Sequence, residues 1–149
     1  MTVGFVVFGI GLVAFGFALR RALAGRAWIA AIVTGASTMA VAATPLGGWS
    51  GDSLHATFAG LGYAAIVLLP ALAAPALAAR GRSGWSRASW LAAIVAASCL
   101  VASTFGPAHG AWQRLGLSIG DVWIVSTAVA VATVSGPFRP EDRRDGHLH

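Results

Sequence analysis

Residues 54–79 read LHATFAGLGYAAIVLLPALAAPALAA, and no charged residue interrupts them. As an α-helix this run would be about 39 Å long, which exceeds the roughly 30 Å hydrocarbon thickness of a bilayer. Ala and Leu outnumber the β-branched residues, and apolar and polar side chains do not alternate, so a membrane strand is not expected. The run therefore predicts a transmembrane helix.

The rest of the chain has the same character. Of its 149 residues, 57% are hydrophobic and 10% are charged, whereas a soluble domain carries roughly 25% charged residues. A chain with so little charge needs lipid around it. The predicted fold class is all-α, a polytopic transmembrane helix bundle of about five spans, at 3–19, 27–43, 54–79, 89–105 and 108–134. Residues 136–149 are expected to form a short polar cytoplasmic tail.

The arginines predict the orientation of these spans. Every basic residue is Arg, and nine of the ten lie in the first loop, the third loop or the tail. Cytoplasmic loops carry an excess of Lys and Arg. The amino end is therefore expected outside and the carboxyl end inside the plasma membrane. Arg114 is the exception, because it lies in a segment assigned to the outer side.

Composition also excludes several classes of function. The net charge of +5 is spread over short arginine groups between apolar runs, so no basic face suited to nucleic acid is expected. The single cysteine, Cys99, rules out a disulfide framework and a cysteine zinc site. No nucleotide-binding loop, haem-attachment motif or zinc-binding HExxH motif is present. We expect no metal ion and no organic cofactor, and an enzyme is the less favoured class.

Polar residues gather in the two segments assigned to the outer side, and one more lies deeper in the last span. We call these candidate ligand-binding residues the outer cluster. Its members are Asp52, His55, His109, Trp112, Gln113, Arg114 and Asp121.

Asp121 lies several residues inside the apolar layer of the last span. An ionisable group at that depth is costly unless it is paired or faces a polar cavity, and it suggests function. Arg114 lies two turns toward the outside on the same helix face and is its nearest candidate partner. A structural reading stays open beside this one: the two form an ion pair between helices, and Trp112 belongs to the interfacial aromatic belt.

Two further patterns concern packing and repetition. Helices in lipid associate through small residues, and three pairs at helical spacing are candidates: Gly116 with Gly120, Ala31 with Gly35, and Ala56 with Gly60. His55 and His109 are each followed by an aromatic residue three positions later and by Leu-Gly at the same offset. This echo fits either a parallel repeat of helical hairpins or chance.

The loop 44–52 with His55 after it, and residues 110–114 with Trp123 after them, resemble the domain-of-unknown-function 998 (DUF998) family of bacterial and archaeal multi-pass membrane proteins. The resemblance extends from the first span to about Val134. It implies six spans, so the first is expected to be missing here. It implies no activity, but it suggests that His55, Gln113 and Arg114 belong to a family feature.

Three hypotheses of function fit these residues. The first is a membrane protein that binds a lipid headgroup or a small anion at the outer cluster, with Arg114 as the fixed positive charge. The second is a metal-dependent hydrolase acting on lipid, with Asp52, His55, His109 and Asp121 as ligands or acid–base groups. The third is a small oligomeric carrier that uses Asp121. The expected partners are the lipid bilayer and a lipid or anion ligand, with a homo-oligomer or a membrane-protein partner also open.

Overall fold

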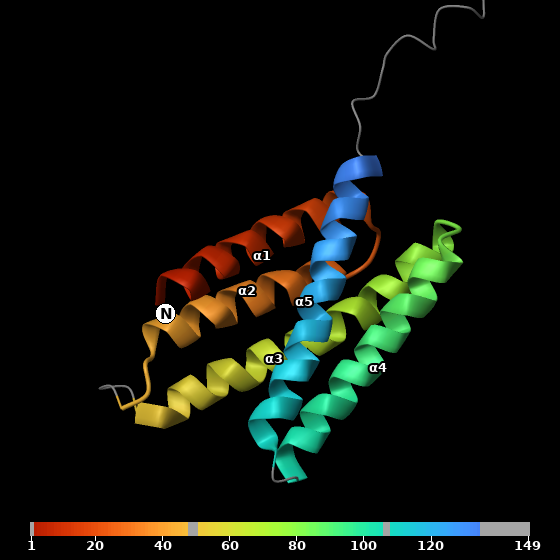
Figure 1. The fold of residues 1–149 in the computed structure, drawn as a ribbon. Helices are drawn as coiled ribbons and strands as arrows, with labels where there is room; N and C mark the ends of the chain where they lie inside the picture. The colour runs from red at the N-terminus through yellow and green to blue at the C-terminus, as the bar shows by residue number, and fades with distance from the viewer. Residues whose placement is uncertain (1, 48–50, 106–107, 135–149) are drawn as a thin grey trace, which may run out of the picture.

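The computed structural model describes residues 2–47, 51–105 and 108–134. These residues form five α-helices and no strand, as predicted (Figure 1). The predicted tail, 136–149, lies outside the described residues. In chain order the helices are α1 (Thr2–Ala22), α2 (Ala27–Ala43), α3 (Gly51–Ala79), α4 (Ser83–Phe105) and α5 (His109–Val134).

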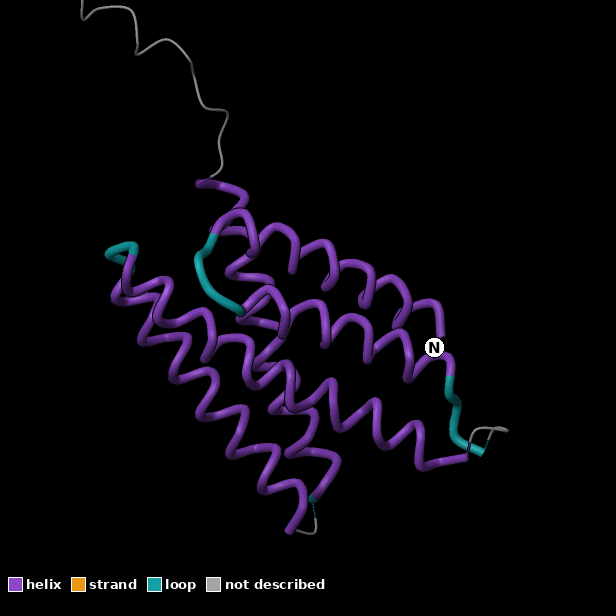
Figure 2. The backbone as a smooth tube through the Cα atoms, turned by 180° about the vertical axis from the view of Figure 1, so that it is seen from behind, coloured by secondary structure: helices purple, strands orange, loops and turns teal. Residues whose placement is uncertain are grey.

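Consecutive helices run antiparallel, so the loops fall at two opposite ends of the bundle (Figures 1 and 2). One end carries the α2–α3 and α4–α5 connections with His55 and His109, and we call it the histidine end. The other carries the α1–α2 and α3–α4 loops, and we call it the arginine end. Its described arginines are Arg20, Arg21, Arg26, Arg80, Arg82 and Arg87. That the arginine end faces the cytoplasm stays a prediction.

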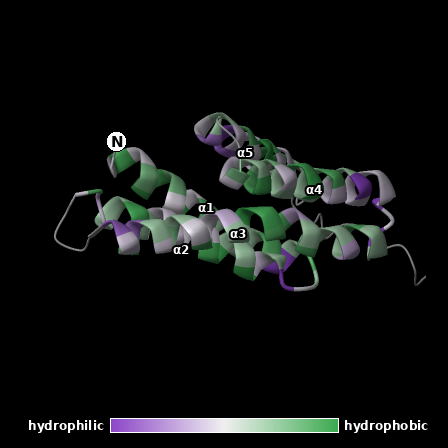
Figure 3. Cartoon of the chain, turned by 90° about the horizontal axis from the view of Figure 1, so that it is seen from below, coloured by the Kyte–Doolittle hydropathy of each residue, from purple (hydrophilic) through white to green (hydrophobic). Residues whose placement is uncertain are grey.

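The outer surface of the bundle is apolar. Hydrophilic side chains gather mainly near helix ends (Figure 3), and large apolar side chains between them point outward. More than half exposed are Val3, Val7, Ile10, Leu68, Leu91, Ile94, Val101, Val122, Val125 and Val129. Four of the helices are long and apolar enough to cross a bilayer, and α2 is a shorter apolar helix of 17 residues. The chain is a polytopic helical membrane protein, as its composition predicted.

The helices match the predicted spans closely except at the start of α4. We expected that span to begin at residue 89, where the apolar run begins, but the helix begins at Ser83. A helix needs only satisfied backbone groups and not apolar side chains, so its first turns extend past the hydrocarbon boundary and carry the exposed Arg87.

Glycines bring α1 and α2 into backbone contact. A Cβ atom built at Gly35 would lie 2.6 Å from the carbonyl oxygen of Gly9, and one at Gly9 would lie 2.8 Å from that of Gly35. Two turns along α1, a Cβ at Gly16 would lie 3.1 Å from the carbonyl oxygen of Trp28. No side chain fits between the backbones at these positions, which is how helices pack when lipid supplies no hydrophobic drive.

The other predicted small-residue pairs differ in what they pack against. Gly116 faces α4, where a Cβ would lie 3.1 Å from that of Cys99, whereas Gly120 faces α3, where a Cβ would lie 2.8 Å from Cγ1 of Ile66. The pair therefore packs, but against two helices. The expected contact of the Ala56–Gly60 pair is absent among the described residues, because nothing lies within 4 Å of a Cβ built at Gly60.

Indole hydrogen bonds join α4 to α5 near the arginine end. The Nε1–H of Trp123 donates to Oγ of Ser89 at 2.8 Å, and that hydroxyl donates to the carbonyl oxygen of Trp85 at 2.8 Å. The Nε1–H of Trp85 donates in turn to Oγ1 of Thr127 at 3.3 Å. Ser89 and Thr127 are almost fully buried, so these polar groups satisfy one another inside the apolar layer.

Gly35→Ala should lower the stability of the bundle by about 1–3 kcal/mol, because its Cβ meets a backbone oxygen that cannot rotate away. Gly60→Ala is the matched control on an exposed helical surface. It should leave stability unchanged or raise it by up to about 1 kcal/mol through helix propensity. Unfolding in mixed detergent micelles measures both, and equal effects of the two substitutions would contradict the close α1–α2 contact.

Candidate functional site

A cavity of about 720 Å³ lies between α1, α2, α3 and α5 in the half of the bundle nearer the histidine end. Its volume is within the range of roughly 300–1,000 Å³ that is usual for sites of small organic ligands. Most of its wall is apolar, and its polar side chains come from all four helices. It is lined by Thr2, Gly4, Phe5, Phe8, Thr34, Ser37, Thr38, Val41, Ala42, Pro45, His55, Phe58, Ala59, Gly62, Tyr63, Ile66, Leu117 and Asp121.

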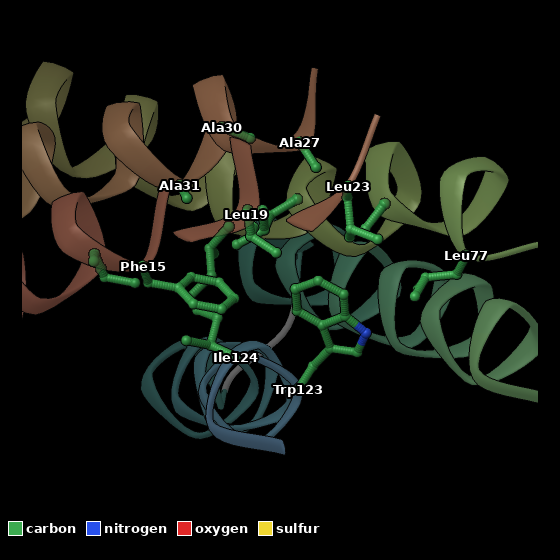
Figure 4. Packing of buried hydrophobic residues seen from close by; sticks show 13 residues of the cluster. Phe15, Leu19, Leu23, Ala27, Ala30, Ala31, Leu77, Trp123 and Ile124 are labelled. Atoms are coloured by element: carbon green, nitrogen blue, oxygen red, sulfur yellow. The ribbon is translucent and has the colours of Figure 1, made fainter. Parts of the chain in front are cut away.

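The cavity exists because α1 and α5 meet only in the half nearer the arginine end. There Phe15 and Leu19 of α1 pack in one buried cluster with Trp123 and Ile124 of α5 (Figure 4). Toward the histidine end α1 follows α2 and diverges from α5 (Figure 1). The space left between them is therefore a wedge, closed by this cluster at its narrow end and partly open elsewhere.

The length of the wedge is a large fraction of the thickness of a membrane. On α3 its lining begins at His55 in the second turn and ends at Ile66, which is about 16 Å along the helix axis. That distance is roughly half of the hydrocarbon thickness. On α5 the deepest lining residue is Asp121, about 18 Å from the helix start at His109. Asp121 therefore lies at the deep end of the cavity; its depth in the apolar layer of the membrane stays a prediction.

Apart from Thr2 and His55 near the histidine end, the polar groups in the wall fall into two sets. Thr34 and Thr38 each donate a hydroxyl hydrogen bond to a carbonyl oxygen one turn earlier in α2, at 2.8 Å, so their donors are already used. Ser37, Tyr63 and Asp121 make no side-chain hydrogen bond or ion pair within the parts of the chain that the structure describes. These three groups therefore retain their hydrogen-bonding capacity for whatever occupies the cavity.

The three unpaired groups lie on helices that contact one another beside the deep half of the wedge. On α2 and α3, Ser37 faces Gly62, since a Cβ at Gly62 would lie 3.3 Å from that of Ser37. On α3 and α5, Ile66 packs on Gly120, the neighbour of Asp121. Tyr63 lies one turn before Ile66 on α3. The deep half of the wedge thus gathers one hydroxyl, one phenol and one carboxyl.

Arg114 is not the partner of Asp121 in this arrangement. It is exposed on α5, about 10 Å from Asp121 along the helix axis, and it is not among the residues that line the cavity. No ion pair joins the two across the described residues. Trp112 is exposed beside Arg114, in keeping with a position at the membrane surface.

His55 and Asp52 hold the α2–α3 connection. Nδ1 of His55 lies 2.6 Å from the carbonyl oxygen of Thr44. Because a carbonyl oxygen can only accept, Nδ1 carries the hydrogen and donates it. Oδ1 of Asp52 accepts a hydrogen bond from the backbone N–H of Gly47 at 3.0 Å. His55 also lines the mouth of the cavity, so one side chain joins the loop to the candidate site.

His109 repeats this contact at the α4–α5 connection. Its Nδ1 lies 2.5 Å from the carbonyl oxygen of Ser103, in the last turn of α4. Each histidine therefore caps the preceding helix from the start of the following one. The two histidines that begin the repeated sequence pattern thus make the same kind of contact. They differ in that His109 is exposed and does not line the cavity.

Gln113 lines a second, much smaller cavity of about 10 Å³ together with Tyr63. That volume is about the space that one water molecule needs. Tyr63 lines both cavities and is the only tyrosine of the chain. Sequence analysis missed it, and the available signal was a lone phenol in the middle of the longest apolar run. Ser37 was missed as well, because helical Ser is common in membrane bundles.

The outer cluster therefore divides into three groups. His55 and Asp121 face the large cavity; Gln113 faces the small one; and Asp52, His109, Trp112 and Arg114 lie at the surface of the histidine end. Nowhere in the described part of the chain do three His, Cys, Asp or Glu side chains come together as metal ligands. The hydrolase hypothesis gains no support from that part of the chain.

Comparison with known proteins adds one finding. The model of a family described as "Protein of unknown function (DUF998)" matches residues 1–130, which includes all residues that line the cavity. The resemblance seen in the loop 44–52, His55 and residues 110–114 is thereby confirmed. No curated protein and no solved structure matches the chain.

His55→Ala should lower the free energy of unfolding by about 0.5–1.5 kcal/mol, because the half-buried carbonyl of Thr44 loses its donor. His109→Ala is the matched control, and its effect should be smaller, since water can reach the exposed carbonyl of Ser103. Chemical unfolding in detergent measures both. A larger effect of His109→Ala would contradict this assignment of the two contacts.

Proposed function

The chain belongs to the DUF998 family, and we propose that it binds a lipid-like amphiphile in the cavity between α1, α2, α3 and α5. The amphiphile is a single molecule with an apolar chain and one polar group. In this proposal the protein resides in the plasma membrane with its histidine end outside, and its role is binding and not catalysis.

The observation that carries the proposal is that the wall of the cavity combines aromatic surface with unused polar groups. Phe5, Phe8 and Phe58 offer aromatic surface to an apolar chain, while Ser37, Tyr63 and Asp121 retain unused hydrogen-bonding capacity deeper in the wedge. Hydrocarbon tails of ordinary bilayer lipids cannot satisfy such groups, and leaving them unsatisfied costs free energy. A ligand that brings both an apolar chain and a polar group suits this wall.

The route into the cavity also favours a ligand from the membrane. Helices α1 and α5 are in contact at the buried cluster of Phe15 and Ile124 and diverge beyond it. A molecule dissolved in the bilayer reaches the wedge between the two helices without crossing water. The same cluster closes the half of the bundle nearer the arginine end, which supports binding over passage through the membrane.

The proposal differs from binding of an anion at Arg114. That side chain is exposed and does not line the cavity, whereas the charged group that does line it is a carboxyl. An exposed Arg at either surface of the membrane can contact lipid phosphates, whichever way the bundle is oriented in the bilayer. It needs no cavity to do so.

Ala59→Trp should remove most ligand binding, because Ala59 lines the cavity beside Phe58 and an indole there would obstruct the path of the apolar chain. Ala56→Trp is the matched control, one turn earlier on α3, exposed and outside the lining. The probe is decanol carrying a diazirine in its chain, incorporated into lipid nanodiscs with the purified protein. After irradiation, mass spectrometry of peptides locates the labelled residues.

The wild type and Ala56→Trp should be labelled at Phe5, Phe8 or Phe58 more strongly than at Val122, which faces outward on α5. Ala59→Trp should lose that excess. Labelling of the wild-type cavity no stronger than that of Val122 would overturn the proposed function, and so would equal cavity labelling in both tryptophan variants.

A further inference from the structure

The charge of the cavity narrows the class of ligand. Asp121 is the only lining residue that is Asp, Glu, Lys or Arg, and the only other ionisable groups in the wall are His55 at the mouth and the phenol of Tyr63. No arginine within residues 2–47, 51–105 and 108–134 lines the cavity, and the one on α5, Arg114, is exposed. An anionic headgroup in the deep half would face a carboxyl without any compensating positive charge.

From this charge complementarity, which rests on the proposed function, we infer that the bound amphiphile carries a positively charged amine, and that this amine pairs with the Asp121 carboxylate. The ligand class is an aliphatic amine or an amine-bearing lipid. Its amine lies at the deep end of the wedge and its chain extends toward the histidine end.

The number of hydrogen-bonding groups fits this ligand. An ammonium group has three donors and no acceptor. The deep half of the wedge offers three acceptors that are unused within the described residues: the carboxylate of Asp121, the hydroxyl of Ser37 and the phenol of Tyr63. An alcohol would use fewer of them. A carboxylate ligand could accept hydrogen bonds from the two hydroxyls, but it would face the Asp121 carboxylate without a compensating positive charge. The wall therefore discriminates by headgroup as well as by shape.

The apolar lining agrees with this direction of binding. Phe58 lies on α3 between Tyr63 and His55, and Phe5 and Phe8 line the same cavity from the first turns of α1. These rings lie nearer the histidine end than the carboxyl does. A chain attached to an amine at Asp121 would therefore extend along the rings toward the mouth at His55.

Competition among three amphiphiles of equal chain length tests the inference. Decylamine, decanol and decanoate displace the diazirine-bearing decanol from the cavity of the protein in nanodiscs, at one pH near neutrality. Each competitor is quantified by its mole fraction in the bilayer, so that differences in partitioning cancel. In the wild type, decylamine should compete at a mole fraction about 10- to 100-fold lower than decanol, as expected for a hydrogen bond to a charged group. Decanoate should be the weakest.

Asp121→Asn should abolish the advantage of decylamine over decanol while preserving the shape of the side chain. Asp52→Asn is the matched control, because it removes the same charge from an exposed residue that does not line the cavity. It should keep the advantage. Labelling by the decanol probe reports whether each variant still folds, and Asp121→Ser serves as a second neutral variant.

The outcomes separate the two proposals. Equal competition by the three amphiphiles in the wild type would overturn the amine inference and leave the lipid-binding function standing. Retention of the amine advantage in Asp121→Asn or Asp121→Ser would overturn it too. Wild-type protein whose cavity takes up no decanol probe, whatever the competitor, would instead overturn the proposed function itself.

Discussion

The close approach of α1 to α2 determines the shape of the rest of the bundle. Gly9 and Gly16 lie two turns apart on α1, and both put its backbone against that of α2. Contacts at two points along α1 fix the direction of its axis, so α1 runs alongside α2 and does not tilt toward α5. The space between α1 and α5 therefore remains open at the histidine end. The cavity is therefore a consequence of glycine packing between α1 and α2.

A second set of contacts holds the opposite wall in place. Trp123 and Trp85 hydrogen-bond across α4 and α5, and Gly120 packs on Ile66 of α3. Two units result, α1 with α2 and α4 with α5, and α3 contacts both. They meet at the apolar cluster of Phe15 and Ile124. The polar side chains of the wedge stand on these packed helices, and a site built on packed helices costs less entropy to organise when it binds a ligand.

The sequence predicted the helices well and the site only in part. Lipid surrounds every span and requires apolar side chains and internally satisfied backbone groups in each of them. The apolar runs in the sequence therefore sufficed to predict α1 to α5. Asp121 was identified because a carboxyl in hydrocarbon is conspicuous wherever it faces. Spacing alone suggested Arg114 as its partner, because the two share a helix face, but Arg114 is exposed and forms no ion pair with Asp121 among the described residues. Tyr63 and Ser37 escaped notice because their significance lies in which helices they face.

The wall of the wedge suits neither the lipid tails nor the water that surround the bundle. A hydrocarbon tail entering it would cover the phenyl rings but would leave the groups of Ser37, Tyr63 and Asp121 without partners. Water entering at the mouth near His55 could satisfy those groups but would then wet three phenylalanines. Each common solvent suits one part of the wall and not the other. An amphiphile suits both, so this wall favours such a molecule over lipid tails and water alike.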